Sequence, residues 1–214
     1  MRTPDPIGRA CLGHLRGLLT VALVLAVTPQ LVAAEVADPD WPCIQRKVAS
    51  LSPASMWPGL GDDTLSADWR SDPDVAALVA RIAPRRVSVE DAQQAIRSFA
   101  AELGEGKEET LKLLFLGLFQ TLDGERSEVM GGIERFARSQ AQQVQRILAE
   151  RSALEEMRQG AETGPEITER SGALTMAIRV FEDRRASLTH VCDVPRIIEQ
   201  RLFALVRTIQ AELA

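Results

Sequence analysis

The sequence predicts an all-α protein: a helical bundle built on a long antiparallel, coiled-coil-like helix hairpin, with an irregular N-terminal arm. After Ser71, almost every segment has apolar residues at helical spacing between recognisable helix starts and stops. In the C-terminal half, two consecutive segments space their apolar residues alternately three and four apart, which is typical of a coiled-coil seam. Only a short, glycine-containing link joins them, so the two helices are expected to fold back on each other.

Residues 1–34 are predicted to be a signal peptide. Three arginines precede an uncharged apolar run from Gly17 to Val27, Pro29 breaks the run, and small residues end at Ala34; the arginines are Arg2, Arg9 and Arg16. We therefore expect cleavage after Ala34, export to the periplasm and no stable membrane span in the mature chain. An uncleaved membrane anchor is the alternative, because residues 17–34 carry no charge.

Residues 35–71 are expected to form the arm. It begins with "DWPCIQRKV", in which Asp40 is a candidate cap and Pro42 an early residue of a short helix, and continues as an extended stretch rich in Pro, Gly, Ser and Asp. All three tryptophans lie in this arm: Trp41, Trp57 and Trp69. Large apolar side chains of this kind would pin the arm to the bundle. The alternative is that they cover a pocket for a small ligand.

The bundle is expected to span residues 72–214, with 35–214 forming one domain. Three helices are predicted over 71–83, 88–104 and 107–124, with Ser71 or Asp72 as the candidate cap of the first and Ser88 as that of the second. The third is apolar on nearly every side, which predicts a buried position at the centre of the bundle.

Two seam helices follow, over about 124–159 and 167–192. Gly131 and Gly132, early in the first, are candidates for close approach of a neighbouring helix, or for a kink. A last helix is predicted from Asp193, with Pro195 in its first turn, so Cys192 is expected at the joint between two helices. The seam residues are Met130, Ile133, Ala137, Gln140, Val144, Ile147, Arg151 and Leu154 in one helix, and Ile167, Ser171, Leu174, Ile178, Phe181, Arg185, Leu188 and Cys192 in the other.

Cys43 and Cys192 are the cysteines that remain once Cys11 is removed with the signal peptide. An even pair in an exported protein is most simply a disulfide. Two free thiols, or half of a metal site, are the alternatives, although the spacing matches no zinc pattern.

Catalytic chemistry is not predicted. His190 is the only histidine after residue 34 and the chain has no tyrosine, so most acid–base and nucleophilic arrangements are excluded. The acidic loop 62–74 lacks the residue order of an EF-hand, which leaves calcium as a minor alternative. We therefore expect no metal and no cofactor. The formal net charge of −5 argues against nucleic acid and against anionic lipid.

Three stretches resemble a group of exported, all-helical proteobacterial proteins of unassigned function: "DWPCIQRKV", "GERSEVMGGIERFAR" and "VCDVPRIIEQRLFALVR". The resemblance implies a shared helical fold, an exported location and the cysteine pair, and it transfers no active site.

These observations favour a non-catalytic periplasmic interaction or scaffold protein. It would contact an envelope or secreted protein, or another copy of itself, through its helix faces or its arm. The alternative function is a periplasmic small-ligand binder or sensor with its pocket beneath the tryptophan arm.

Overall fold

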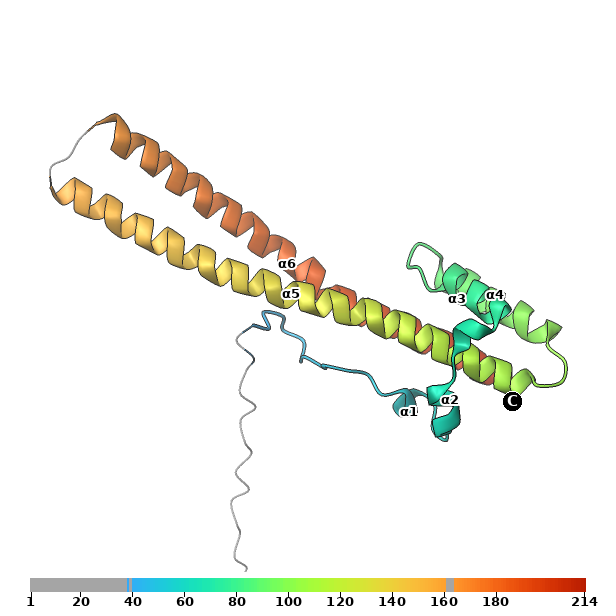
Figure 1. The fold of residues 1–214 in the computed structure, drawn as a ribbon. Helices are drawn as coiled ribbons and strands as arrows, with labels where there is room; N and C mark the ends of the chain where they lie inside the picture. Colours follow the sequence, from blue (N-terminus) through green and yellow to red (C-terminus); the bar gives the residue numbers. More distant parts are fainter. Residues whose placement is uncertain (1–37, 39, 161–163) are drawn as a thin grey trace, which may run out of the picture. The chain divides into compact units, whose positions relative to one another are not determined.

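Two long helices, α5 (Lys107–Gln159) and α6 (Pro165–Ala211), form an antiparallel hairpin (Figure 1). The computed structural model describes residues 38, 40–160 and 164–214, so the predicted signal peptide lies outside the described residues. Gln140 on α5 donates to the carbonyl of Phe181, at 3.4 Å. Further along, the Arg170 guanidinium reaches both Glu150 carboxylate oxygens, at 2.8 and 3.0 Å. The residue number of the contact increases along α5, from 140 to 150, while it decreases along α6, from 181 to 170. The two helices are therefore antiparallel, which confirms the predicted hairpin and the all-α fold class.

Shorter helices pack on one end of this hairpin. They are α1 (Pro53–Met56), α2 (Asp62–Ser66), a 3-10 turn η1 (Trp69–Ser71), α3 (Pro73–Ile82) and α4 (Val89–Glu102). α3 packs mainly on α5, and α4 packs mainly on α6. The predicted caps are confirmed: the Asp72 carboxylate accepts from the amides of Asp74 and Val75, and the Ser88 hydroxyl accepts from the amide of Asp91.

The hydrophobic core lies where α3 and α4 meet the first part of α5 and the last part of α6. The apolar stretch of α5 is at its centre, as predicted: Leu111, Leu114, Phe115 and Leu118 are fully buried. Opposite them lie Ile198, Leu202, Leu205 and Ile209 of α6. No described residue between 130 and 193 belongs to this core cluster.

The predicted break near Gly124 is wrong, because α5 runs without interruption from Lys107 to Gln159. Gly124 is exposed, and an added Cβ there would meet nothing within 4 Å. Leu122, Arg126 and Met130 continue a buried row across it at spacings of four. Because the row stays on one face, the cost of about 1 kcal/mol for a glycine does not end the helix.

The predicted joint at Cys192 is also wrong, because α6 continues through Pro195. A proline inside a helix removes one backbone hydrogen bond and costs about 3 kcal/mol. Here Pro195 is itself buried, with Cys192 and Ile198 on either side of it also buried. Continuing the helix keeps one apolar row against α5, and burial of that row offsets the proline.

The short helix predicted over residues 40–48 is not formed. Residues 41–52 contain no helix, and we call the irregular segment 40–51 the strap. A helix this short is unstable alone, because nucleation fixes several residues for one hydrogen bond. The strap instead makes its polar contacts to the two long helices.

Candidate interaction site

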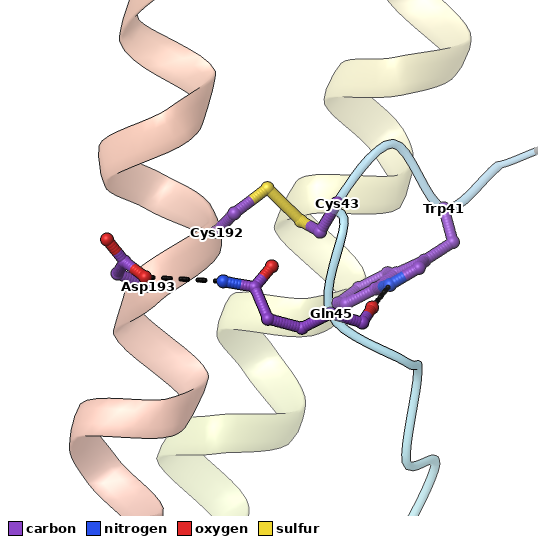
Figure 2. Close-up of a disulfide and its surroundings, with 5 residues drawn as sticks. All are labelled: Trp41, Cys43, Gln45, Cys192 and Asp193. Carbon is purple, nitrogen blue, oxygen red and sulfur yellow. Dashed lines mark hydrogen bonds between the residues drawn. A yellow bond between two sulfur atoms is a disulfide. The ribbon is translucent and has the colours of Figure 1, made fainter.

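A disulfide between Cys43 and Cys192 joins the strap to the middle of α6, as predicted (Figure 2). The Cα atoms of the two cysteines are 5.6 Å apart, an ordinary separation for a disulfide. Beside it, Gln45 Nε2 donates to Asp193 Oδ1 at 3.2 Å, and Trp41 Nε1 donates to the carbonyl of Gln45 at 2.7 Å. The sequence therefore identified the pair correctly while misplacing both elements that carry it.

Ion pairs tie the strap to α5 as well. Lys47 Nζ lies 2.7 Å from Glu134 Oε1 and also bonds Asp38, while Arg138 Nη1 lies 2.7 Å from Asp40 Oδ2. The hydrogen bond that Lys47 donates to Asp38 lowers the pKa of Asp38, and the bonds that Lys47 donates to Asp38 and Glu134 raise the pKa of Lys47. The strap thus bridges α6, through the disulfide, and α5, through these charges.

Arg126 is a site residue that the sequence analysis missed. It is 1 % exposed, and its Nε donates to Glu199 Oε1 on α6 at 2.6 Å. Its Nη2 donates to the carbonyl of Val48 in the strap. One buried guanidinium therefore connects α5, α6 and the strap. Its signal in the sequence is a charged residue in an otherwise apolar helical row, between Leu122 and Met130.

Arg201, two positions after Glu199 on α6, has the same kind of role, and it was missed as well. It is 5 % exposed, and its two terminal nitrogens donate to the carbonyls of Ile82 and Val87, at 2.6 and 2.8 Å. Burial lowers the pKa of this guanidinium. The Arg201 side chain donates hydrogen bonds to carbonyls at the end of α3 and in the α3–α4 link, so it fixes α3 and α4 against α6.

Trp57 and Trp69 are buried in the core, which fits the prediction that they pin the arm. The ring centroids of Trp57 and Phe115 are 5.1 Å apart, and Trp69 Nε1 donates to Gln120 Oε1 at 2.9 Å. Trp41 is half-buried beside the disulfide. No tryptophan lines any of five cavities on the described part of the chain.

The structure does not place a neighbouring helix against Gly131 or Gly132. A Cβ added at either would meet, within 4 Å, only the side chain of Arg135 on the same helix. The close approach occurs at Gly117 instead, where a Cβ would lie 2.8 Å from Val79 Cγ2 and 2.9 Å from two ring atoms of Trp69. A single glycine within an apolar run gave no sequence signal for this role.

We call residues 134–159 of α5 and 165–191 of α6 the outer hairpin. Within its described side chains only Leu154 is buried. Most of the predicted seam is half-buried, while Arg151, Ile178 and Arg185 are exposed. The exposed large apolar residues of this region are Leu148 at 49 %, Met176 at 60 %, Ile178 at 37 %, Val180 at 41 % and Val191 at 43 %.

Two mostly apolar grooves follow the outer hairpin. One, of about 380 Å³, is lined by residues that include Gly132, Phe136 and Val191. The other, of about 620 Å³, is lined by residues that include Ile147, Ala153, Ala173 and Ala177. The strap lines a third groove together with Ala186 and Thr189, which lie on another side of α6.

The described residues do not bring metal-binding groups together: no group of three or more His, Cys, Asp or Glu side chains is placed to hold an ion. In the same part of the chain, no helix has the length and apolar character needed to cross a membrane. Comparison with protein-family models, with curated proteins and with solved structures gives no match to this chain. The candidate site consists of the disulfide-anchored strap and the outer hairpin, in which only Leu154 is buried among the described side chains.

Proposed function

We propose that this chain is an exported, non-catalytic interaction protein that binds a protein partner through its outer hairpin. The observation that carries the proposal is the burial pattern: two helices, each more than 25 residues long in this region, bury only Leu154 between them. A helix surface that is apolar but left half-exposed is typical of a protein-binding face. The helix-in-groove mode is the one such a surface fits.

The strap supports the same function by making the base of the outer hairpin rigid. The disulfide at Cys192 and the charged contacts at Glu134 and Arg138 all lie where the core ends and the outer hairpin begins. A rigid base lowers the conformational entropy that is lost when a partner binds. The disulfide and the N-terminal segment "RGLLTVALVLAVTPQLVAA" support an exported location for this binding.

Site-specific photo-crosslinking in the cells that produce the protein tests the proposal. A photoreactive phenylalanine at Met176 or Val180, on the exposed side of α6, should give a discrete adduct with a protein. The matched control is Gln94, an exposed residue of α4 in the same chain, which should give none. Equal adducts from all three positions, or none from the hairpin positions, would contradict the proposal.

A further inference from the structure

The Cys43–Cys192 disulfide lies in a surface groove and not in the core. Neither cysteine belongs to the core cluster, and both line the third groove, of about 420 Å³, where the strap meets α6. Cys43 is half-buried between Pro42 and Ile44, which are both exposed, and Ile44 is 103 % exposed. A protein that approaches Cys43 from solvent therefore meets a large apolar side chain directly beside the disulfide.

Polar contacts at the surface hold the strap to the long helices. Among residues 40–50, all of which the structure describes, no apolar side chain belongs to the core cluster or packs against it. The side chains of the Lys47–Glu134 and Arg138–Asp40 ion pairs are between 24 % and 47 % exposed, and ion pairs at the surface contribute little to stability. The disulfide, a covalent bond, is therefore what fixes residues 40–47 in place.

We propose that this disulfide is a site of thiol–disulfide exchange with a protein dithiol, and that its reduction releases residues 40–47 of the strap from the hairpin. The core cluster takes no side chain from these residues, so the strap opens locally while the bundle stays folded. The strap then acts as a latch at the base of the outer hairpin, closed when Cys43 and Cys192 are oxidised and open when they are reduced.

The exchange takes two steps. A thiolate of the dithiol attacks the sulfur of Cys43, the more exposed of the two cysteines, and forms a mixed disulfide; Cys192 leaves as a thiolate and takes a proton from water. The second thiolate of the dithiol then attacks its own partner's sulfur in the mixed disulfide and displaces Cys43, which is protonated in turn. Two electrons and two protons pass to the chain, and the dithiol is oxidised to a disulfide.

The released segment ends at Val48. The Arg126 guanidinium, which is 1 % exposed, donates from Nη2 to the Val48 carbonyl and from Nε to Glu199. Loss of the Val48 bond would leave this buried group with one partner fewer, which is costly. Leu51, three positions later, packs against the core. Val48 and the residues after it therefore stay in place when residues 40–47 leave.

Trypsin measures the release, since Arg46 and Lys47 are tryptic sites within the strap. The disulfide-bonded chain is compared with chain that has been reduced and alkylated with iodoacetamide, and with the double variant Cys43→Ser/Cys192→Ser, which excludes an effect of the alkyl groups. Cleavage at the strap sites should be at least about ten-fold faster without the disulfide. Arg97, an exposed residue of α4, is the internal control and should still be cut at least about ten-fold more slowly than the strap.

Two results of this experiment would overturn the proposal. Strap cleavage that does not accelerate shows that other contacts hold the strap. Strap cleavage that only matches cleavage at Arg97, or loss of the helical signal in far-UV circular dichroism, shows that the whole bundle opens and that the strap is not a separate latch.

Thioredoxin, a protein dithiol, and dithiothreitol, a small one, test the recognition. Ile44→Ser should slow reduction by thioredoxin at least about three-fold and leave the rate with dithiothreitol unchanged, because only a protein covers Ile44. Leu148→Ser, which removes a 49 % exposed apolar side chain of the outer hairpin, is the matched control and should change neither rate. Thioredoxin with its second active-site cysteine replaced by serine should be trapped on Cys43. A conjugate on Cys192, or an Ile44→Ser effect that is equal for both reagents, would overturn the proposed exchange.

Discussion

Replacing Gly117 by alanine tests how closely α5 approaches η1 and α3. The added methyl group would lie 2.8 Å from Val79 Cγ2 and 2.9 Å from Cδ2 and Cε3 of Trp69. Distances below 3.0 Å between such atoms require a shift. Neither neighbour can move easily, since Val79 is 1 % exposed and Trp69 is 6 % exposed. The hydrogen bond from Trp69 to Gln120 also fixes the indole ring.

Two opposing effects set the change in the free energy of unfolding for Gly117→Ala. Overpacking a core typically costs about 1–3 kcal/mol. Alanine in place of glycine within a helix returns about 0.5–1 kcal/mol. We therefore expect Gly117→Ala to lower the free energy of unfolding by up to about 2.5 kcal/mol. Gly124→Ala, two turns further along α5, is the matched control, because nothing lies within 4 Å of its added Cβ. It should raise the free energy of unfolding by about 0.5–1 kcal/mol.

Urea unfolding of the disulfide-bonded chain, followed by circular dichroism and by tryptophan fluorescence, measures both variants. The midpoints should move in opposite directions while the slope stays constant. The fluorescence of Gly117→Ala should also change in the folded state, because Trp69 has to move. If Gly117→Ala is as stable as Gly124→Ala, Trp69 does not rest on Gly117 and the packing described here is incorrect.

Three further changes test the strap and the hairpin. Replacing both Cys43 and Cys192 with serine removes a disulfide that links residues 149 positions apart. The free energy of unfolding, measured by urea titration, should fall by about 3–5 kcal/mol. An unchanged midpoint would show that the disulfide does not restrict the unfolded chain. Arg126→Met roughly keeps the side-chain volume but loses the buried hydrogen bonds. It should lower the free energy of unfolding by about 1–3 kcal/mol in the same assay. A more stable variant would show that the desolvation cost of the guanidinium outweighs its hydrogen bonds. The hydrogen bond from Arg170 lowers the pKa of Glu150 below its ordinary value of 4.5. The pair therefore stabilises the hairpin fully above pH 4.5, and this stabilisation is lost as the pH falls through the lowered pKa. Carboxyl-detected NMR titration should give Glu150 an ordinary pKa in Arg170→Met, and a pKa that remains low would assign the shift to another group.

Features that depend on local pattern were predictable from the sequence. The caps at Asp72 and Ser88, the central position of residues 111–122 and the antiparallel hairpin all follow from spacing and from short-range chemistry. The disulfide followed from cysteine counting, which depends on compartment and not on the surrounding structure.

Features that depend on tertiary contact were not predictable. A helix start signal such as Asp193 with Pro195 is a local preference, and burial of a continuous apolar row against α5 outweighs it. The short helix at residues 40–48 was lost to contacts with α5 and α6 that lie about 90–150 positions away in the chain. The importance of Gly117 depends on Trp69, 48 positions earlier, whose side chain is brought to it only by the fold.

The strap divides the long hairpin into two parts that are stabilised in different ways. On the inner side, the core cluster and Arg201 hold α5 and α6 against α3 and α4. On the outer side, the seam buries one leucine and the remaining apolar residues stay partly in water. The core cluster contains no described residue between 130 and 193, so the outer hairpin contributes no side chain to it. The outer hairpin therefore adds apolar surface that the described part of the chain leaves partly exposed, and the disulfide at its base ties that surface to the strap.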